Sequence, residues 1–252
     1  MSLHRREFLS GSILAGSAGL AYLAGTPVTT RGEEQHTDLI RPGSVILFQG
    51  DSITDTGRSR ETADTPNQRS TLGSGYAWLA ASQLLVDRPD ANLKIYNRGI
   101  SGNKVPDLAK RWDVDCLNLK PDVLSILIGV NDYWHRRNGR YDGTLDSYET
   151  GYRELLQRTL EKLPSVKLVL CEPFALNTGK VDDSWFPELD GYRAVAKKMS
   201  EEFRTVFVPF QQAFDRAVAY AEPAEWAADG VHPSPSGAAL MAHEWQKQVQ
   251  GK

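Results

Sequence analysis

One serine in this chain stands where a nucleophile is expected, directly after a short apolar run. Residues 45–49 (Val-Ile-Leu-Phe-Gln) lead into Gly50, Asp51 and Ser52. This pattern predicts a buried strand that ends in a sharp turn and holds the Ser52 hydroxyl at the strand's carboxyl end. Active sites of open parallel α/β sheets form at that edge. We therefore interpret Ser52 as a candidate nucleophile, which would need a base supplied by a later part of the chain.

Three other polar turns contain glycine and could supply partners for Ser52. They are residues 98–100 (Arg-Gly-Ile), 129–132 (Gly-Val-Asn-Asp) and 229–232 (Asp-Gly-Val-His). Taken singly, each has an ordinary explanation as a helix cap, a turn glycine or a loop histidine. Their joint occurrence in this order, at the predicted carboxyl ends of parallel strands, favours one shared site.

The elements that must position these turns follow from the apolar pattern. Continuous apolar runs predict strands at 45–49, 93–97, 123–128, 166–171 and 206–208, and the third has the character of a central strand covered on both faces. Helical spacing predicts helices at 76–86, 105–119, 145–163, 192–203, 210–220 and 235–249. The polar residues 55–72 are predicted to form a long surface loop beside the site.

This alternation of strands and helices predicts a single three-layer α/β domain. Parallel strands joined by right-handed crossovers place helices on both faces of the sheet. The 252 residues, 40% of them hydrophobic, suffice for one sizeable core. A formal net charge of -3 gives no reason to expect a nucleic acid or an anionic membrane surface as partner.

The N-terminus has the composition of an export signal rather than of a folded element. Residues 1–25 carry the pair Arg5-Arg6 and then a short, glycine-rich apolar stretch, which resembles a twin-arginine signal. An anchor helix is disfavoured because a span needs about 20 apolar residues. We predict a protein exported to the periplasm or beyond, without stable membrane insertion, in which residues 26–42 are a linker and 43–252 the domain. Export would permit a Cys116–Cys171 disulfide, but their apolar surroundings favour two buried free thiols.

The polar turns together resemble a known family. Gly50-Asp51-Ser52-Ile53, Gly99, Gly129-Val130-Asn131-Asp132 and Asp229-Gly230-Val231-His232-Pro233 are similar to the four sequence blocks of the SGNH (GDSL-type) hydrolases, in the family's order. The resemblance spans residues 45–250. It implies a five-stranded flavodoxin-like sheet of order 2-1-3-4-5, and ester hydrolysis without a metal or a cofactor.

The resemblance also implies a role for each motif residue. Ser52 would attack the acyl carbon, with His232 as its base and Asp229 orienting the imidazole. The oxyanion would be held by the backbone N–H groups of Ser52 and Gly99 and by the side-chain amide of Asn131.

Four other histidines compete with His232 for the role of base. His4 and His36 lie in the predicted signal and linker, and His243 lies within a predicted helix. His135 is nearer the site but has no acidic residue at a matching offset, so His232 is favoured.

The substrate is less clear from the residues. The polar loop 55–72 offers no apolar trench for a long acyl chain, whereas Tyr133, Trp134 and Trp185 fall in predicted site-edge loops and could stack on a sugar. We expect these aromatic residues and Asp51 to contact the substrate. Together with export, this favours a short acyl group, acetyl above all, on a carbohydrate.

Two alternatives remain open. One is a lysophospholipase or thioesterase that acts on longer acyl chains, a range that similar enzymes also cover. The other is a non-catalytic carbohydrate-binding α/β domain, which would not need Ser52, Asp229 and His232 together.

Overall fold

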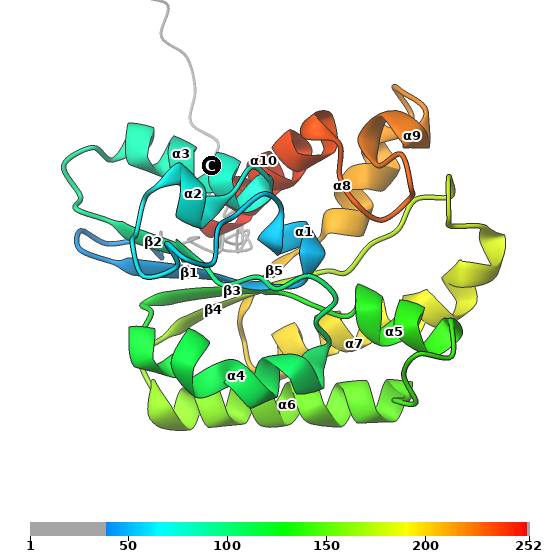
Figure 1. The fold of residues 1–252 in the computed structure, drawn as a ribbon, viewed down its shortest axis with the longest axis horizontal. Helices are drawn as coiled ribbons and strands as arrows, with labels where there is room; N and C mark the ends of the chain where they lie inside the picture. The colour runs from blue at the N-terminus through cyan, green and yellow to red at the C-terminus, as the bar shows by residue number, and fades with distance from the viewer. Residues whose placement is uncertain (1–38, 251–252) are drawn as a thin grey trace, which may run out of the picture. The chain divides into compact units, whose positions relative to one another are not determined.

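A computed structural model describes residues 39–250 of the chain, and these form a parallel sheet with helices on both faces (Figure 1). The strands are β1 (Val45–Gly50), β2 (Lys94–Asn97), β3 (Val123–Leu127), β4 (Lys167–Cys171) and β5 (Val206–Val208). All neighbouring strands are parallel, and their order is β2-β1-β3-β4-β5. The predicted fold class and strand order are confirmed. The predicted signal at 1–25 and most of the predicted linker lie outside the described residues.

The helices cover the two faces of the sheet and its carboxyl edge. The α-helices are α1 (Ser52–Asp55), α2 (Arg69–Leu72), α3 (Tyr76–Asp87), α4 (Val105–Asp115), α5 (Val130–Arg137), α6 (Leu145–Lys162), α7 (Phe186–Glu202), α8 (Phe210–Ala217), α9 (Pro223–Trp226) and α10 (Pro235–Gln250). Short 3-10 turns are η1 (Leu117–Leu119) and η2 (Asp183–Trp185). Helices α3, α8 and α10 lie on one face, and α4, α6 and α7 lie on the other (Figure 1). None of the helices in the described part of the chain has the length and hydropathy that crossing a bilayer requires.

The predicted helices and the observed ones differ most around the loops. Helix α7 begins at Phe186 rather than at Tyr192, while α5 and α9 were not predicted as helices. Helix α5 escapes a search for apolar periodicity because its second half, from Trp134 onwards, is polar and partly or fully exposed. The predicted loop 55–72 contains α2 and is not wholly on the surface, since Leu72 is fully buried.

The core is continuous from β1 to the last helix. Phe48 on β1 packs against Tyr76 of α3 and Trp245 of α10, with ring centroids 5.8 and 5.0 Å apart. Cys116 and Cys171 are both buried and free, as the apolar surroundings predicted. Burial raises the pKa of the Cys171 thiol to about 12.

One polar residue interrupts the apolar central strand. Ser125 on β3 is fully buried, and its Oγ accepts a hydrogen bond of 3.0 Å from Trp245 Nε1. This bond joins the sheet to α10 and satisfies the indole N–H in a place that water does not reach.

We expect Ser125→Ala to destabilise the fold, because it leaves the buried Trp245 N–H without its acceptor. The cost should be about 1–3 kcal/mol in the free energy of unfolding. Urea denaturation followed by tryptophan fluorescence measures it, with Ser165→Ala, the same change at an exposed position, as the control. Equal stability of the two variants would contradict the role assigned to Ser125.

Candidate active site

Ser52 is held at the carboxyl end of β1 by the residues that precede it. Gly50 has a φ of +158°, and a Cβ there would lie 2.4 Å from the carbonyl oxygen of Leu127 on β3. Only glycine permits this approach. Asp51 then caps α1, because its buried carboxylate accepts the Ile53 N–H at 3.0 Å. Strand and helix are thus joined through one sharp turn, and Ser52 is the first residue of α1.

The structure brings Ser52, His232 and Asp229 together. Ser52 Oγ lies 2.8 Å from His232 Nε2, and His232 Nδ1 lies 2.9 Å from Asp229 Oδ2. The second oxygen of Asp229 accepts the backbone N–H groups of Val231 and His232, at 3.0 and 2.8 Å. Burial alone would raise the pKa of Asp229, but these hydrogen bonds outweigh it and lower the pKa to about 2. The carboxylate therefore stays ionised beside the imidazole.

The histidine loop is fixed from two directions. The Gly230 carbonyl accepts the Leu176 N–H from the chain that follows β4, at 2.8 Å. Ser234 donates from Oγ to the Glu225 carbonyl at 2.6 Å, which anchors the loop to α9. The unpredicted helix α9 thus supports the loop that carries His232.

This arrangement suits nucleophilic chemistry at a surface. A histidine within hydrogen-bond reach can take the proton of a serine hydroxyl and return it to a leaving group. The His232 side chain is 43% exposed, so a substrate can approach it from solvent. Within the described residues, no hydrogen bond joins Ser52 to His135 or His243. His4 and His36 lie outside those residues.

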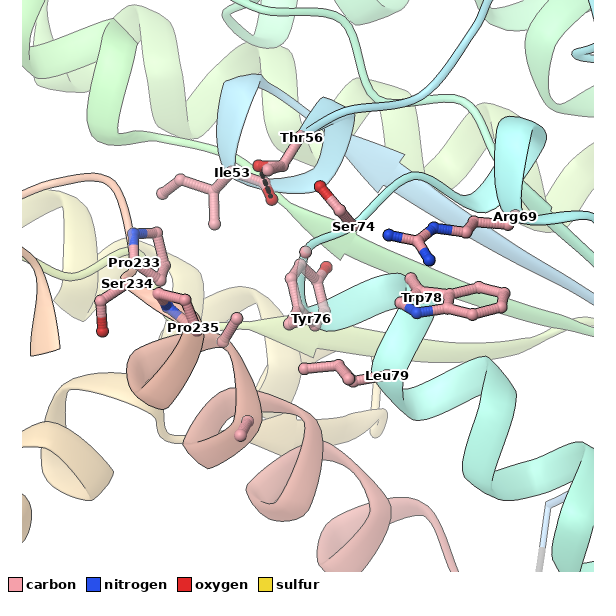
Figure 2. A pocket seen from close by; sticks show the side chains of 13 residues that line it. Ile53, Thr56, Arg69, Ser74, Tyr76, Trp78, Leu79, Pro233, Ser234 and Pro235 are labelled. Carbon is pink, nitrogen blue, oxygen red and sulfur yellow. Dashed lines mark hydrogen bonds between the residues drawn. The ribbon is translucent and has the colours of Figure 1, made fainter.

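A pocket of about 390 Å³ adjoins this pair of side chains (Figure 2). Ile53 and Pro233, the residues that follow Ser52 and His232, both line it. Figure 2 shows Pro233 to Pro235 on one side of it and Arg69 with Trp78 on the other. The lining residues are Ile53, Thr56, Arg69, Ser74, Gly75, Tyr76, Trp78, Leu79, Pro233, Ser234, Pro235, Ala238 and Ala239.

Gly99 does not fill the role that its motif position implied. Its N–H donates to Asn97 Oδ1 at 2.9 Å, so this amide is already engaged and buried. A Cβ at Gly99 would lie 2.6 Å from the Asp55 nitrogen. Glycine is needed here for packing against α1 and not for the approach of a substrate, and the prediction for Gly99 was wrong.

Gly102, three residues later, has the free amide instead. Residues 100, 101 and 103 all donate their N–H groups within the protein, to Gly50 O, Asp55 Oδ2 and Ile100 O. Gly102 has a φ of +80°, and its N–H has no acceptor among residues 39–250. The carbonyl of the next residue, Asn103, accepts from Asn131 Nδ2 at 3.3 Å. Gly102 therefore lies close to Asn131. In the sequence, the feature that could have pointed to Gly102 is the second glycine of the run Gly-Ile-Ser-Gly-Asn at residues 99–103.

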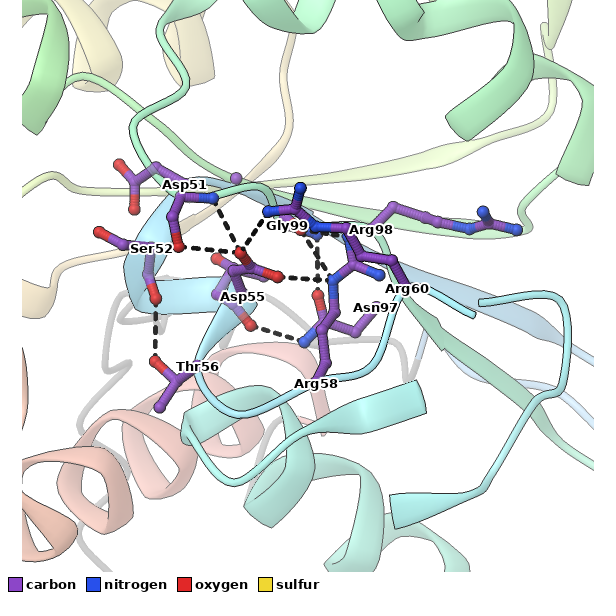
Figure 3. Close-up of polar contacts among 12 residues, drawn as sticks. Asp51, Ser52, Asp55, Thr56, Arg58, Arg60, Asn97, Arg98 and Gly99 are labelled. Carbon is purple, nitrogen blue, oxygen red and sulfur yellow. Dashed lines mark hydrogen bonds and ion pairs between the residues drawn. The ribbon is translucent and has the colours of Figure 1, made fainter. Parts of the chain in front are cut away.

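A buried ion pair fixes the glycine turn to α1 (Figure 3). Arg58 Nε contacts Asp55 Oδ1 at 2.8 Å, and both side chains are nearly buried, at 3% and 10% exposed. The same guanidinium donates twice to the Gly99 carbonyl, at 2.8 and 2.5 Å. Asp55 Oδ2 accepts the N–H and the hydroxyl of Ser101, at 2.9 and 2.8 Å. Arg58 falls in the predicted surface loop, where nothing in the sequence distinguishes it from solvated arginines.

Two further carboxyl groups are buried next to these motifs. Burial raises the pKa of Asp51 and of Asp132 to about 7 each. Asp132 Oδ1 accepts the N–H of Val105, the first residue of α4, at 3.1 Å. At and below neutral pH these two groups therefore tend to be protonated, which limits the negative charge beneath the site.

Three of the four residues expected to contact the substrate are in the interior. Asp51 and Tyr133 are fully buried, and Trp185 is 2% exposed and packs on Tyr133 with ring centroids 5.3 Å apart. The prediction for these three was wrong, because the Asp51 carboxylate caps α1 and the other two side chains pack on each other between α5 and η2. Trp134 alone remains partly exposed, with its ring centroid 6.3 Å from that of His232.

Comparison with known proteins places this chain in a family. The family model of the GDSL-like lipases/acylhydrolases matches residues 48–240. An acetylxylan esterase of Geobacillus stearothermophilus is 36% identical over 215 residues, which cover 83% of this chain and 95% of that one. Solved structures of an acetylxylan esterase from the same organism are 34–35% identical, with TM-scores of 0.75–0.76 and coverage of 83% of this chain and 95% of that one. They include variants described as catalytic mutants, in which a serine, an aspartate or a histidine is replaced by alanine.

Two other solved structures are similar. A protein described as a GDSL-like lipase from Parabacteroides merdae is 51% identical, with a TM-score of 0.82 and coverage of 84% of this chain and 98% of that one. LAE5, an α/β hydrolase enzyme from the metagenome of Lake Arreo, is 31% identical, with a TM-score of 0.77 and coverage of 84% and 97%. This chain therefore belongs to the GDSL-like lipase/acylhydrolase family and is a carboxylic ester hydrolase.

Proposed function

We propose that the protein is a serine esterase that removes acetyl groups from carbohydrates. The observation that carries the proposal is the chain of hydrogen bonds from Ser52 through His232 to Asp229, with distances of 2.8 and 2.9 Å. The similarity to an acetylxylan esterase over most of both chains supports the acetyl group and the carbohydrate. The export signal expected at residues 1–25 would bring the enzyme to a polysaccharide outside the cytoplasm.

In this proposal the reaction proceeds through an acyl-enzyme. Ser52 Oγ attacks the ester carbon while His232 Nε2 takes the hydroxyl proton, and the imidazolium then gives that proton to the leaving sugar oxygen. Water, deprotonated by the same imidazole, releases acetate and restores Ser52. Asp229 holds Nδ1–H of the imidazole and stabilises its cation.

The negative oxygen of the tetrahedral intermediate needs donors that are not already in use. We assign this role to the N–H groups of Ser52 and Gly102 and to Asn131 Nδ2. The first two have no acceptor within the described part of the chain. The amide of Asn131 makes only one long hydrogen bond, of 3.3 Å, which a developing oxyanion can replace. Gly102 takes the place that the sequence motif suggested for Gly99.

Acetate release from a panel of acetylated glycans tests the proposal directly. We expect the wild type to release acetate and Ser52→Ala to lose at least about three powers of ten in kcat, because the nucleophile is removed. Rates on p-nitrophenyl acetate, butyrate and octanoate supply the control for acyl length. A preference for octanoate would refute the acetyl specificity, and an active Ser52→Ala would refute the nucleophile.

We expect Asn131→Ala to lower kcat by roughly two to three powers of ten while the fold survives, because one oxyanion donor is lost. The value of kcat for p-nitrophenyl acetate measures this, with circular dichroism to confirm folding. An unchanged kcat would remove Asn131 from the proposed oxyanion hole.

We expect Arg58→Lys to lower kcat by up to about a hundredfold, because a lysine keeps the charge near Asp55 but cannot make the paired hydrogen bonds to the Gly99 carbonyl. The turn that carries Gly102 would then shift. Arg60→Lys is the matched control, since Arg60 also binds Asp55, at 3.1 Å, but its side chain is 58% exposed. Equal kcat for the two variants on p-nitrophenyl acetate would contradict a positioning role for Arg58.

A further inference from the structure

The pocket next to Ser52 and His232 lies beside the histidine loop and away from the proposed oxyanion donors Gly102 and Asn131. In the proposed reaction the carbonyl oxygen faces Gly102 and Asn131, and neither of these lines the pocket. The leaving oxygen must receive its proton from His232 Nε2. Pro233 and Ser234, the two residues that follow this histidine, form part of the pocket wall.

The size of the pocket exceeds what an acetyl group needs. A group of two carbons and an oxygen requires no more than two or three water-sized volumes of about 30 Å³ each. The pocket encloses about 390 Å³, within the range of small-molecule sites. It has room for a whole sugar ring.

The lining combines an aromatic wall with unused hydrogen-bond donors. Trp78 is partly exposed, and the Arg69 guanidinium lies over its ring, 5.9 Å from the centroid. The Arg69 guanidinium makes no ion pair or hydrogen bond with any residue between 39 and 250, and it contacts the Trp78 ring instead. A sugar ring presents an apolar C–H face, which packs on an indole, and hydroxyl oxygens, which accept from a guanidinium.

We propose that this pocket binds the sugar ring that carries the acetyl ester, with Trp78 as its apolar wall and Arg69 as a donor to its hydroxyl groups. The inference rests on the proposed function and adds to it the place and the residues of carbohydrate recognition. The pocket thereby determines selectivity for the alcohol part of the ester and not for the acyl part.

The test compares two acetyl esters that differ only in the alcohol. Fully acetylated xylobiose can fill the pocket, and methyl acetate cannot. For Trp78→Leu we expect KM for the sugar ester to rise about five- to tenfold, the loss expected for one aromatic contact. The kcat/KM for methyl acetate should stay within about twofold of wild type. Trp78→Phe keeps a ring and should recover most of the affinity, and Arg69→Met should raise KM for the sugar ester alone.

Tyr220→Ala serves as the matched control, since it removes an aromatic ring that is 89% exposed and lies outside the pocket. Equal effects of Trp78→Leu on both esters, or no effect on either, would overturn the inference while leaving the proposed function in place. The inference would also be overturned if Trp78→Leu selectively lost activity on p-nitrophenyl octanoate, because that result would assign the pocket to an acyl chain. A wild type that hydrolyses methyl acetate but no acetylated glycan would overturn the proposed function itself.

Discussion

The hydrogen bond between Ser52 and His232 joins residues 180 positions apart, and most of the architecture serves to make that contact. Ser52 follows a central strand, while His232 arrives only after the last strand, α8 and α9. Because each parallel strand must be re-entered from the same end, every strand delivers its following loop to one edge of the sheet. The loop of His232 is then held by the chain after β4 and by α9, so that its imidazole has little freedom.

Negative charge around Ser52 is distributed unevenly, because some carboxyl groups accept hydrogen bonds or ion pairs and others are only buried. Hydrogen bonds keep Asp229 ionised beneath the imidazole, where a negative charge stabilises the imidazolium. Asp55 is also ionised, but Arg58 and the N–H of Ser101 compensate it. Asp51 and Asp132 are buried and form no ion pair with any residue between 39 and 250, and burial raises their pKa values to about 7. Of these four carboxyl groups, Asp229 and Asp55 therefore carry most of the negative charge at neutral pH.

The two sides of the site have different chemistry. On the side of α3 and α10 the pocket offers Trp78 and the unpaired Arg69. On the other side Trp134 lies near His232. The Nζ atom of Lys180 lies over the Trp134 ring, 5.6 Å from its centroid. In the proposed function, the sheet edge holds the hydroxyl, the base and the acid, whereas the loops and helix ends around them would select the ester.

The strands and the hydrogen-bonded set of Ser52, His232 and Asp229 were predictable because their signals are local. A parallel strand covered on both faces is a continuous apolar run, and Asp229 and His232 can meet from one loop because only two residues separate them. Which glycine keeps its N–H free could not be predicted, because Gly99 and Gly102 look alike in the sequence. In the structure the Asn97 side chain, two residues before Gly99, accepts the Gly99 N–H, while the N–H of Gly102 has no acceptor among residues 39–250.

The burial of individual side chains also depends on contacts that appear only in the folded chain. Tyr133 and Trp185 have the composition of a sugar-binding edge, yet they pack on each other in the core. Arg58, in a polar stretch, is nearly buried and donates to the carbonyl of Gly99, 41 residues further along the chain. The sequence by itself determined the sheet, its order of elements and the serine, histidine and aspartate. The tertiary structure decided which polar groups are satisfied and which aromatic faces remain open, because both depend on neighbours that are distant along the chain.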